Sequence, residues 1–362
     1  MATKAGVTFT FGAMHIAPGH TLVRRLLDTT VLEETQMASF TSILAATDFS
    51  ADGNNAVRRA ACLAHELGAR LRILHVLKAT RRKALRDWFS PTPAFDLEAT
   101  QARDALRRLA IEMAGEHDLI ATVEVAVGDP FETLQKASEH VDLVVLGWRR
   151  HGRFKGMLGA STVDRMIRVG RRPVLVVKTS VQGSYRRVLV PIDFTASSDA
   201  AIRVADRMRR ETGMHVFHAI DSKREAVLRE ADVPEHVIRE TRLMEEGAIN
   251  ARMRRQVARL GLDSAPMNYA LAHGHPVRST LRHAHRLGAD LIVAGKQVRS
   301  SLGSSLLGSV SSRVVSEAGC DTLIVPWRRE SAAPQASRAH AGAWTQGHWI
   351  HKKARFASRR AS

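Results

Sequence analysis

Residues 42–49 read SILAATDF and residues 187–194 read RVLVPIDF, so an apolar run that ends in Asp-Phe occurs twice in the chain. A second pair of matching runs follows: VDLVVLG at residues 141–147 and ADLIVAG at residues 289–295. A repeat of about 145 residues is too long for a solenoid unit and has the length of a whole domain. The chain of 362 residues therefore consists mainly of two copies of one domain.

Each copy alternates apolar strand segments with segments of helical periodicity. In the first copy, Ser50 is typical of a helix N-cap and Gly68 of the residue that closes the same helix. The second copy repeats the pattern with Thr195 and Gly213 at those positions. Alternating strands and helices predict a parallel α/β sheet covered on both faces, and ligands bind such sheets beyond the carboxyl ends of the strands.

The repeat also sets the predicted domain boundaries. Residues 1–38 form an N-terminal extension, expected to be disordered or to precede the true start of translation, and residues 39–179 and 184–327 form the two domains. Residues 328–362 form a basic tail with 8 Lys and Arg against 1 Asp and Glu, which we expect to be disordered. Because this tail holds much of the net charge of +18, we expect no nucleic-acid binding beyond weak contacts through the tail.

The cysteines and the apolar runs indicate the cellular compartment. Cys62 and Cys320 occupy non-equivalent positions in different copies, so the sequence predicts no disulfide and fits a reducing environment. The N-terminal extension has no apolar run of signal-peptide length, and no segment predicts a membrane span. We therefore expect a cytoplasmic protein that does not contact a membrane.

The loop after the fourth strand of the second copy carries the clearest indication of chemistry. Gly295 follows that strand, and Gly308 and Ser309 directly precede an apolar helical pattern. We expect Ser309 to stand at a helix N-terminus, where free backbone N–H groups and the positive end of the helix favour a phosphate. Gly295 would let the backbone approach a ligand closely because it has no Cβ. The loop is not a P-loop, since no Lys precedes the serine, and Gly-rich turns of this kind are common.

The Asp-Phe-(Ser/Thr) after each first strand, the glycine that ends each fourth strand and the Gly-Ser before a helix together resemble the universal stress protein family in its tandem form. The resemblance covers residues 40–327. It implies two tandem doubly wound α/β domains of the adenine-nucleotide alpha-hydrolase-like type, each with a five-stranded parallel sheet in the order 3-2-1-4-5. It also implies ATP as the ligand, with an accompanying Mg²⁺ left open.

In nucleotide-binding members of the family, the acid after the first strand lies near adenine and ribose, the backbone after the strand-two histidine contacts adenine, and the loop holds ribose and phosphates. The resemblance assigns to the second domain, as the preferred site, Asp193, Ala219, Gly295, Gly308, Ser309 and Val310. It assigns to the first domain Asp48, Val76, Gly147, Arg150, Ser161 and Thr162.

The two sites depart from the family motif to different extents. Val298 and Arg150 replace its second glycine, and Ala160 stands where the second domain has Gly308. If that position needs a positive φ or a close approach, Ala160 costs about 1 kcal/mol or more. We therefore expect the second domain to bind ATP more tightly than the first.

Other roles for these residues remain open. Asp48 and Asp193 are also the kind of side chain that caps a following helix, and we expect His75 and His218, which end the second strands, to be structural. No nucleophile or general base accompanies the acids, so we expect an ATP-binding stress-response regulator without catalysis. A nucleotide-free scaffold is the first alternative, and a weak ATPase or phosphotransferase is the second.

Two expectations concern metals and partners. Four histidines lie close together in the second domain, but their spacing matches no metal site: His273, His275, His283 and His285. We expect the two copies to pair through their last strands, residues 172–178 and 321–326, as an intramolecular pseudo-dimer, because unpaired apolar edges promote association. A homodimer of the whole chain is left open.

Overall fold

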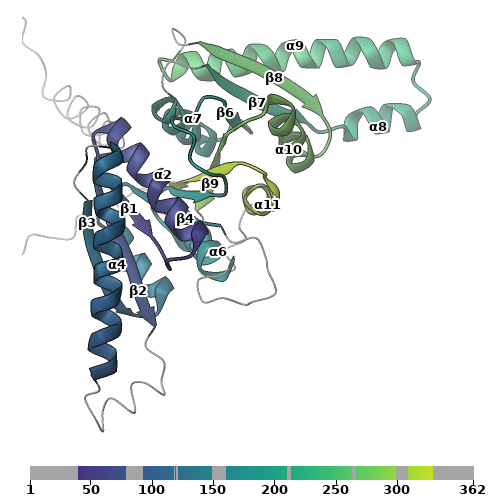
Figure 1. Ribbon diagram of the computed structural model, residues 1–362. Coiled ribbons are helices and arrows are strands. Elements are labelled where there is room, and N and C mark those ends of the chain that lie inside the picture. Colours follow the sequence, from purple (N-terminus) through teal and green to yellow (C-terminus); the bar gives the residue numbers. More distant parts are fainter. Residues whose placement is uncertain are drawn as a thin grey trace, which may run out of the picture. The chain divides into compact units, whose positions relative to one another are not determined.

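The computed structural model of the protein, drawn in Figure 1 with colours that follow the sequence, describes most of both copies. It describes residues 40–78, 93–117, 119, 121–148, 160–209, 213–262, 266–298 and 309–328. The predictions made for residues 1–38, for the tail after residue 328 and for the two loops at 149–159 and 299–308 fall outside these residues. None of the helices in the described part of the chain is long and apolar enough to cross a membrane.

In the first copy, strands and helices alternate along the chain (Figure 1). The strands are β1 (Ser42–Ala46), β2 (Arg70–Lys78), β3 (Ala121–Gly128), β4 (Leu143–Gly147) and β5 (Val174–Val177). The helices are α2 (Ala51–Leu67), α4 (Pro93–His117), α5 (Pro130–Ser138) and α6 (Ala160–Val169). As predicted, Ser50 is the N-cap of α2 and accepts a hydrogen bond from Gly53 N, and Gly68 ends the helix with a φ of 64°.

The second copy repeats this arrangement, and among the described residues it has one more helix than the first copy. Its strands are β6 (Val188–Pro191), β7 (Met214–Ile220), β8 (Met267–His273), β9 (Leu291–Val298) and β10 (Asp321–Arg328). Its helices are α7 (Ala196–Met208), α8 (Lys223–Glu230), α9 (Glu235–Arg259), α10 (Pro276–Leu287) and α11 (Ser309–Glu317). The prediction for Gly213 was wrong: α7 ends at Met208, and the extended residue Arg209 is its C-cap.

The described strands form one sheet in the order β3-β2-β1-β4-β5-β10-β9-β6-β7-β8. Within each copy the strands pair in parallel and follow the predicted order 3-2-1-4-5, so the predicted fold class is confirmed. Strands β5 and β10 pair antiparallel, with Leu175 opposite Leu323. The last strand of each copy therefore lies inside the sheet, where it has a partner on both sides.

Helices cover both faces of the sheet in each copy. In the first copy, α2 and α4 pack on one face, for example through Leu63 and Leu106, and α5 and α6 pack on the other face, for example through Leu134 and Met166. In the second copy, α7 and α9 pack on one face of the sheet, and α10 and α11 pack on the other face. Burial on both faces explains why the central strands are continuous apolar runs rather than alternating ones.

The parallel registers bring the predicted site residues to one edge of the sheet. In the first copy, Ala46 of β1 lies opposite Leu146 of β4, so Asp48 and Gly147 emerge at the same carboxyl edge. Helix α2 begins directly after this edge. The edge is the place where ligands bind in open α/β sheets.

Candidate functional site

In the first copy, the carboxylate of Asp48 turns toward the start of helix α2. Its Oδ1 accepts a hydrogen bond from Ser50 N at 3.0 Å and another from Ser50 Oγ. Gly53 leaves room for this carboxylate, since a Cβ at that position would lie 2.8 Å from Asp48 Oδ1. The helix cap itself is Ser50, whose Oγ accepts the bond from Gly53 N at 3.1 Å. Asp48 therefore positions the cap and is not the cap.

In the second copy, Asp193 occupies the same place with a stronger set of donors. Its Oδ1 accepts hydrogen bonds from Thr195 N at 3.1 Å, from Thr195 Oγ1 and from Ser198 Oγ at 2.6 Å. Burial raises the pKa of Asp193, but the hydrogen bonds from Ser198 and Thr195 outweigh it, so the pKa is lowered overall. This carboxylate is therefore ionised at neutral pH. Among the described residues its accepted bonds all go to Oδ1, which leaves Oδ2 for a ligand.

The residue after each acid has a strained backbone. Phe49 has a φ of 61° and Phe194 a φ of 63°, a region that bulky side chains rarely adopt. The Phe49 ring lies 4.3 Å from the ring of His75, whose Nδ1 is hydrogen-bonded to Thr47 O at 2.8 Å. In the second copy, the rings of Phe194 and His218 are 4.7 Å apart. The histidines thus hold the turn in place, and strain of this kind collects at functional sites.

Gly147 is the last residue of β4, but Gly295 lies inside β9, which continues to Val298, so the prediction that Gly295 follows its strand was wrong. A Cβ on Gly147 would overlap the carbonyl oxygen of Asp52, and a Cβ on Gly295 would overlap the carbonyl oxygen of Ser197. Both oxygens belong to the first turn of the helix that follows the acid. Each glycine therefore permits close packing of a strand against a helix start, and the approach of a ligand to the Gly295 backbone stays a prediction.

The backbone positions expected to contact adenine lie on the second strands. Val76 is buried on β2 and pairs with Ala126 of β3. Ala219 is half-buried on β7 and pairs with Ala272 of β8. Each follows its histidine near the carboxyl edge of the sheet, on the same side as the acid of that copy.

A hollow at the carboxyl edge of the first copy brings several predicted residues together. Asp48, Gly147 and Thr162 line it, together with Ser50 and Asp52. Thr162 is buried and belongs to the first turn of α6. The N-terminal turn of α6 therefore lies beside the hollow that the Asp48 carboxylate also lines, and such a turn offers free backbone N–H groups to an anion.

The remaining predicted residues lie on or near the two loops. Arg150 and Gly308 fall outside the described residues. Ser309 is the first residue of α11, as predicted, and Ser161 is the second residue of α6. Val310 is half-buried and packs against the apolar cluster on its own helix face.

One part of the argument for unequal sites was wrong. Ala160 is the first residue of α6 and has helical backbone, so a positive φ is not required there and strain does not arise. Val298, which stands at the position of the motif's second glycine, is the last residue of strand β9 and pairs with Arg328. The steric argument, which compares the Ala160 methyl group with Gly308, stays a prediction.

The histidines of the second copy are engaged separately. His273 lies 2.9 Å from Glu246 and 3.8 Å from Glu225 on helices α9 and α8. His283 stacks on Phe217 with 4.8 Å between ring centroids. Across the ranges that the structure describes, no group of three or more His, Cys, Asp or Glu residues is placed to hold a metal ion.

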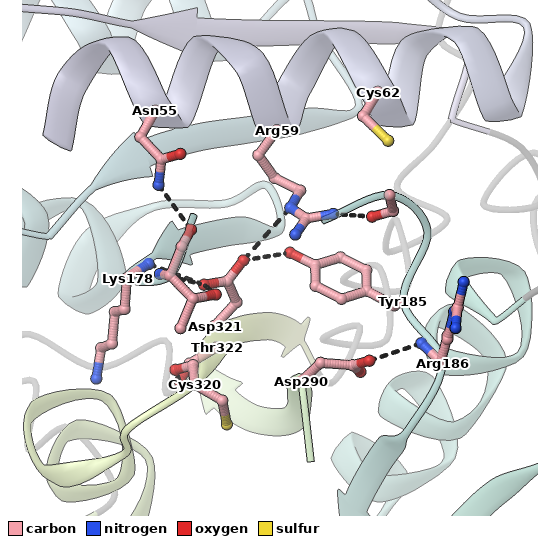
Figure 2. A network of polar contacts seen from close by, with 12 residues as sticks. Asn55, Arg59, Cys62, Lys178, Tyr185, Arg186, Asp290, Cys320, Asp321 and Thr322 are labelled. Atoms are coloured by element: carbon pink, nitrogen blue, oxygen red, sulfur yellow. Dashed lines mark hydrogen bonds and ion pairs between the residues drawn. The ribbon is translucent and has the colours of Figure 1, made fainter. Parts of the chain in front are cut away.

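A buried polar network joins the two copies, and its centre is Asp321 (Figure 2). Asp321 begins β10 and is 0% exposed. Its Oδ1 accepts hydrogen bonds from Lys178 N at 2.8 Å, Thr179 N at 3.1 Å and Thr179 Oγ1 at 2.9 Å. These donors directly follow strand β5, so the carboxylate of the second copy holds the end of the last strand of the first copy.

The other oxygen of Asp321 faces the segment between the copies and helix α2. Tyr185 Oη donates to Oδ2 at 2.7 Å, and Arg59 Nε lies 3.5 Å from the same atom. The Arg59 guanidinium stacks over the Tyr185 ring at 4.3 Å and donates to Gly183 O at 2.6 Å (Figure 2). Burial, and then the charge of Asp321, raise the pKa of Tyr185 well above its usual value, so the phenol stays protonated and donates.

Sequence reasoning missed this network. Its signal was present but weak: the first copy has Pro173 where the second copy has Asp321, counted from the paired residues Leu175 and Leu323. The structure explains this difference between the repeats, because Asp321 accepts hydrogen bonds from Lys178 and Thr179 of the first copy.

Comparisons with known proteins agree with this architecture. Residues 39–178 and 184–326 each match the model of the universal stress protein family. A universal stress protein of Mycolicibacterium smegmatis is 27% identical over 307 residues, which cover 80% of this chain and 98% of that protein. Universal stress protein YxiE of Bacillus subtilis is 32% identical over 154 residues, which cover 39% of this chain and 99% of that protein. A solved universal stress protein from Archaeoglobus fulgidus shares the fold, with a TM-score of 0.58 at 21% identity over 79% of this chain and 98% of its own.

Proposed function

Because the chain belongs to the universal stress protein family in its tandem form, we propose that it binds ATP at the carboxyl edge of each copy and acts as a regulator without catalysing a reaction. In this proposal nucleotide occupancy changes how the protein meets its partners. The observation that carries the proposal is the hollow of the first copy, where Asp48, Gly147 and the first turn of α6 meet.

The chemistry of that hollow suits a nucleotide with separate sugar and phosphate ends. An ionised carboxylate accepts hydrogen bonds from ribose hydroxyls, and a helix start donates backbone N–H groups to a phosphate. Asp193 supplies the same carboxylate in the second copy, where its lowered pKa keeps it ionised. Thr162 adds a hydroxyl within the first copy's helix turn.

The absence of catalysis is part of the proposal. The side chains that line the hollow together with Asp48 include Ser50 and Asp52, and Asp48 already holds the Ser50 hydroxyl. That hydroxyl accepts from Gly53 N, so Ser50 is engaged as a helix cap rather than poised as a nucleophile. We propose a cytoplasmic location as well, supported by Cys62 and Cys320, which are buried thiols and form no disulfide with each other.

Calorimetric titration of the full chain with ATP tests the proposal. We expect two binding events in the wild type, one of which disappears in Asp48→Ala and the other in Asp193→Ala. Glu230→Ala, an exposed acid at the end of α8, is the control and keeps both. GTP and cAMP serve as competitors, and titrations with and without EDTA show whether Mg²⁺ accompanies the nucleotide. If the wild type binds no nucleotide, the scaffold alternative replaces this proposal; if it releases ADP and phosphate on incubation, the ATPase alternative does.

A further inference from the structure

Lys296 is a buried cation that reaches from the second copy into the first. It directly follows Gly295 in β9, and the whole residue is only 5% exposed to solvent. Its Nζ donates hydrogen bonds to the carbonyl oxygens of Ile167 and Arg168, which lie in the last turn of α6. The last carbonyls at the C-terminal end of a helix have no intrahelical partner, and the Lys296 amine gives two of them a hydrogen-bond donor.

Lys178 makes the same contact in the opposite direction. It directly follows β5 of the first copy, and its Nζ donates to Val315 O and, at 2.8 Å, to Ala318 O. Val315 lies in the last turn of α11 in the second copy, and Ala318 directly follows that helix. Figure 2 shows the Lys178 side chain extending away from the Asp321 network while its backbone N–H stays within that network.

The two lysines are not equivalent positions of the repeat. Gly147 and Gly295 are equivalent, so Lys296 corresponds to Trp148, and Lys178 corresponds to a proline of β10. In the first copy, Trp148 lies beneath the ammonium group instead, with Lys178 Nζ 5.3 Å from its ring centroid. Each copy therefore contacts the helix end of the other copy with a lysine, but the two lysines stand at different positions of the repeat. Duplication of one ancestral domain does not account for this.

The first turn of each target helix is the turn expected to meet a phosphate. α6 starts at Ala160 and α11 at Ser309, so each is only about 15 Å long at 1.5 Å per residue. A helix this short moves as one body, and a shift at its C-terminal end moves the N–H groups at its start. The expected phosphate-binding turn of each copy is thus linked through its helix to a lysine of the other copy.

We propose that Lys296 and Lys178 are positioning residues that couple the two nucleotide sites crosswise, which rests on the proposed function. Lys296 holds the C-terminal end of α6 in the first copy, and Lys178 holds the C-terminal end of α11 in the second copy. Because Lys296 is adjacent to Gly295 within β9, a nucleotide at the second site that shifts this strand changes the affinity of the first site. The coupling passes across the β5–β10 pair.

The test measures each site separately by calorimetry at pH 7. Asp193→Ala leaves the first site, and Asp48→Ala leaves the second. In the Asp193→Ala chain, adding Lys296→Met weakens ATP binding roughly three- to tenfold, and adding Lys178→Met causes a smaller loss. In the Asp48→Ala chain the order of the two effects reverses. Lys223→Met, which removes a lysine whose side chain is 88% exposed, changes neither affinity.

Two further variants separate positioning from folding. Lys296→Arg and Lys178→Arg keep the charge at the helix end, and we expect each to recover most of the affinity of its opposite site. Circular dichroism melting identifies any variant that has unfolded. If one lysine variant is unfolded, the variant at the other lysine is compared at the two sites instead. Equal losses at both sites, or no loss at either, overturn the coupling while leaving the proposed function intact. Failure of the wild type to bind ATP overturns the proposed function first.

Discussion

Tyr185 Oη donates a hydrogen bond of 2.7 Å to Oδ2 of Asp321, and the two residues are only 1% and 0% exposed. Tyr185 belongs to the segment that connects the copies, and Asp321 begins the strand through which the second copy meets the first. A buried carboxylate is tolerated only when its oxygens have donors. The connection between the copies thus depends on polar groups as well as on the apolar strands β5 and β10.

Tyr185→Phe is therefore expected to destabilise the protein by about 1–3 kcal/mol, because it leaves a buried carboxylate oxygen without its hydroxyl donor. Thr179→Val removes one of three donors to the other oxygen and should cost less, since Lys178 N and Thr179 N remain. Urea denaturation measures both. Equal costs for the two changes would show that Oδ2 does not depend on Tyr185.

The close packing at the fourth strands gives a second prediction. Gly147→Ala and Gly295→Ala place a methyl group against the carbonyl oxygens of Asp52 and Ser197, and we expect each to cost on the order of 2–4 kcal/mol. Gly247→Ala is the matched control, because this glycine lies within helix α9 and nothing stands within 4 Å of the added methyl group.

We expect Gly247→Ala to stabilise the protein by roughly 0.5–1 kcal/mol through helix propensity. Thermal melting of the three variants shows the contrast. Tolerance of alanine at both Gly147 and Gly295 would mean that the helix starts are not packed against β4 and β9 as described.

Asp52 provides a prediction about the unequal sites. It lines the hollow of the first copy, and the equivalent position in the second copy is Ser197. A carboxylate at this position repels phosphate, so Asp52→Ser should tighten ATP binding at the first site a few-fold, and Ser197→Asp should weaken it at the second. Titrations in the Asp193→Ala and Asp48→Ala chains measure each effect, which should shrink at high salt. Opposite signs, or effects independent of salt, would contradict the electrostatic explanation.

Lys296 gives a pH prediction. Burial, and then the nearby Arg168, lower the pKa of Lys296 from 10.5 to about 8 in the folded protein. Between pH 8 and 10.5 the unfolded chain therefore holds a proton at this lysine that the folded chain has released. Stability rises with pH wherever the unfolded state binds more protons, so this group stabilises the fold increasingly across that window.

The measurement compares wild type with Lys296→Met, which cancels the other titrating groups. The wild type should gain on the order of 2–3 kcal/mol relative to the variant between pH 7.5 and 10.5, most of it above pH 8. Chemical denaturation at several pH values provides these numbers. A difference that stays constant with pH would mean that the lysine keeps its ordinary pKa.

Much of the fold follows from the residues alone. Ser50 and Gly68 mark the ends of α2 because each satisfies backbone groups that a helix leaves unpaired. The prediction from Gly213 failed because a glycine in a loop after a helix is not always its cap, and α7 ends at Met208, five residues before this glycine. Local signals of this kind fix most elements and miss a boundary where tertiary contacts decide it.

The site was less predictable because its geometry depends on contacts between distant segments. The acids Asp48 and Asp193 could be chosen from the repeat, but the strain at Phe49 and Phe194 could not, since no local preference favours a positive φ for phenylalanine. The roles of Lys178, Lys296 and Asp321 also require knowledge of which surfaces of the two copies meet. In the sequence, these three residues stand out only as charged residues beside or within apolar strands.

The central claim, that a nucleotide lies at the carboxyl edge of each copy, is tested most directly by photolabelling the full chain with 8-azido-ATP and mapping the labelled peptides by mass spectrometry. The account predicts saturable labelling, displaced by ATP, on peptides that contain Val76 and Ala219, with the first lost in Asp48→Ala and the second in Asp193→Ala. Labelling confined to the basic tail after residue 328, or labelling that excess ATP does not displace, would contradict it.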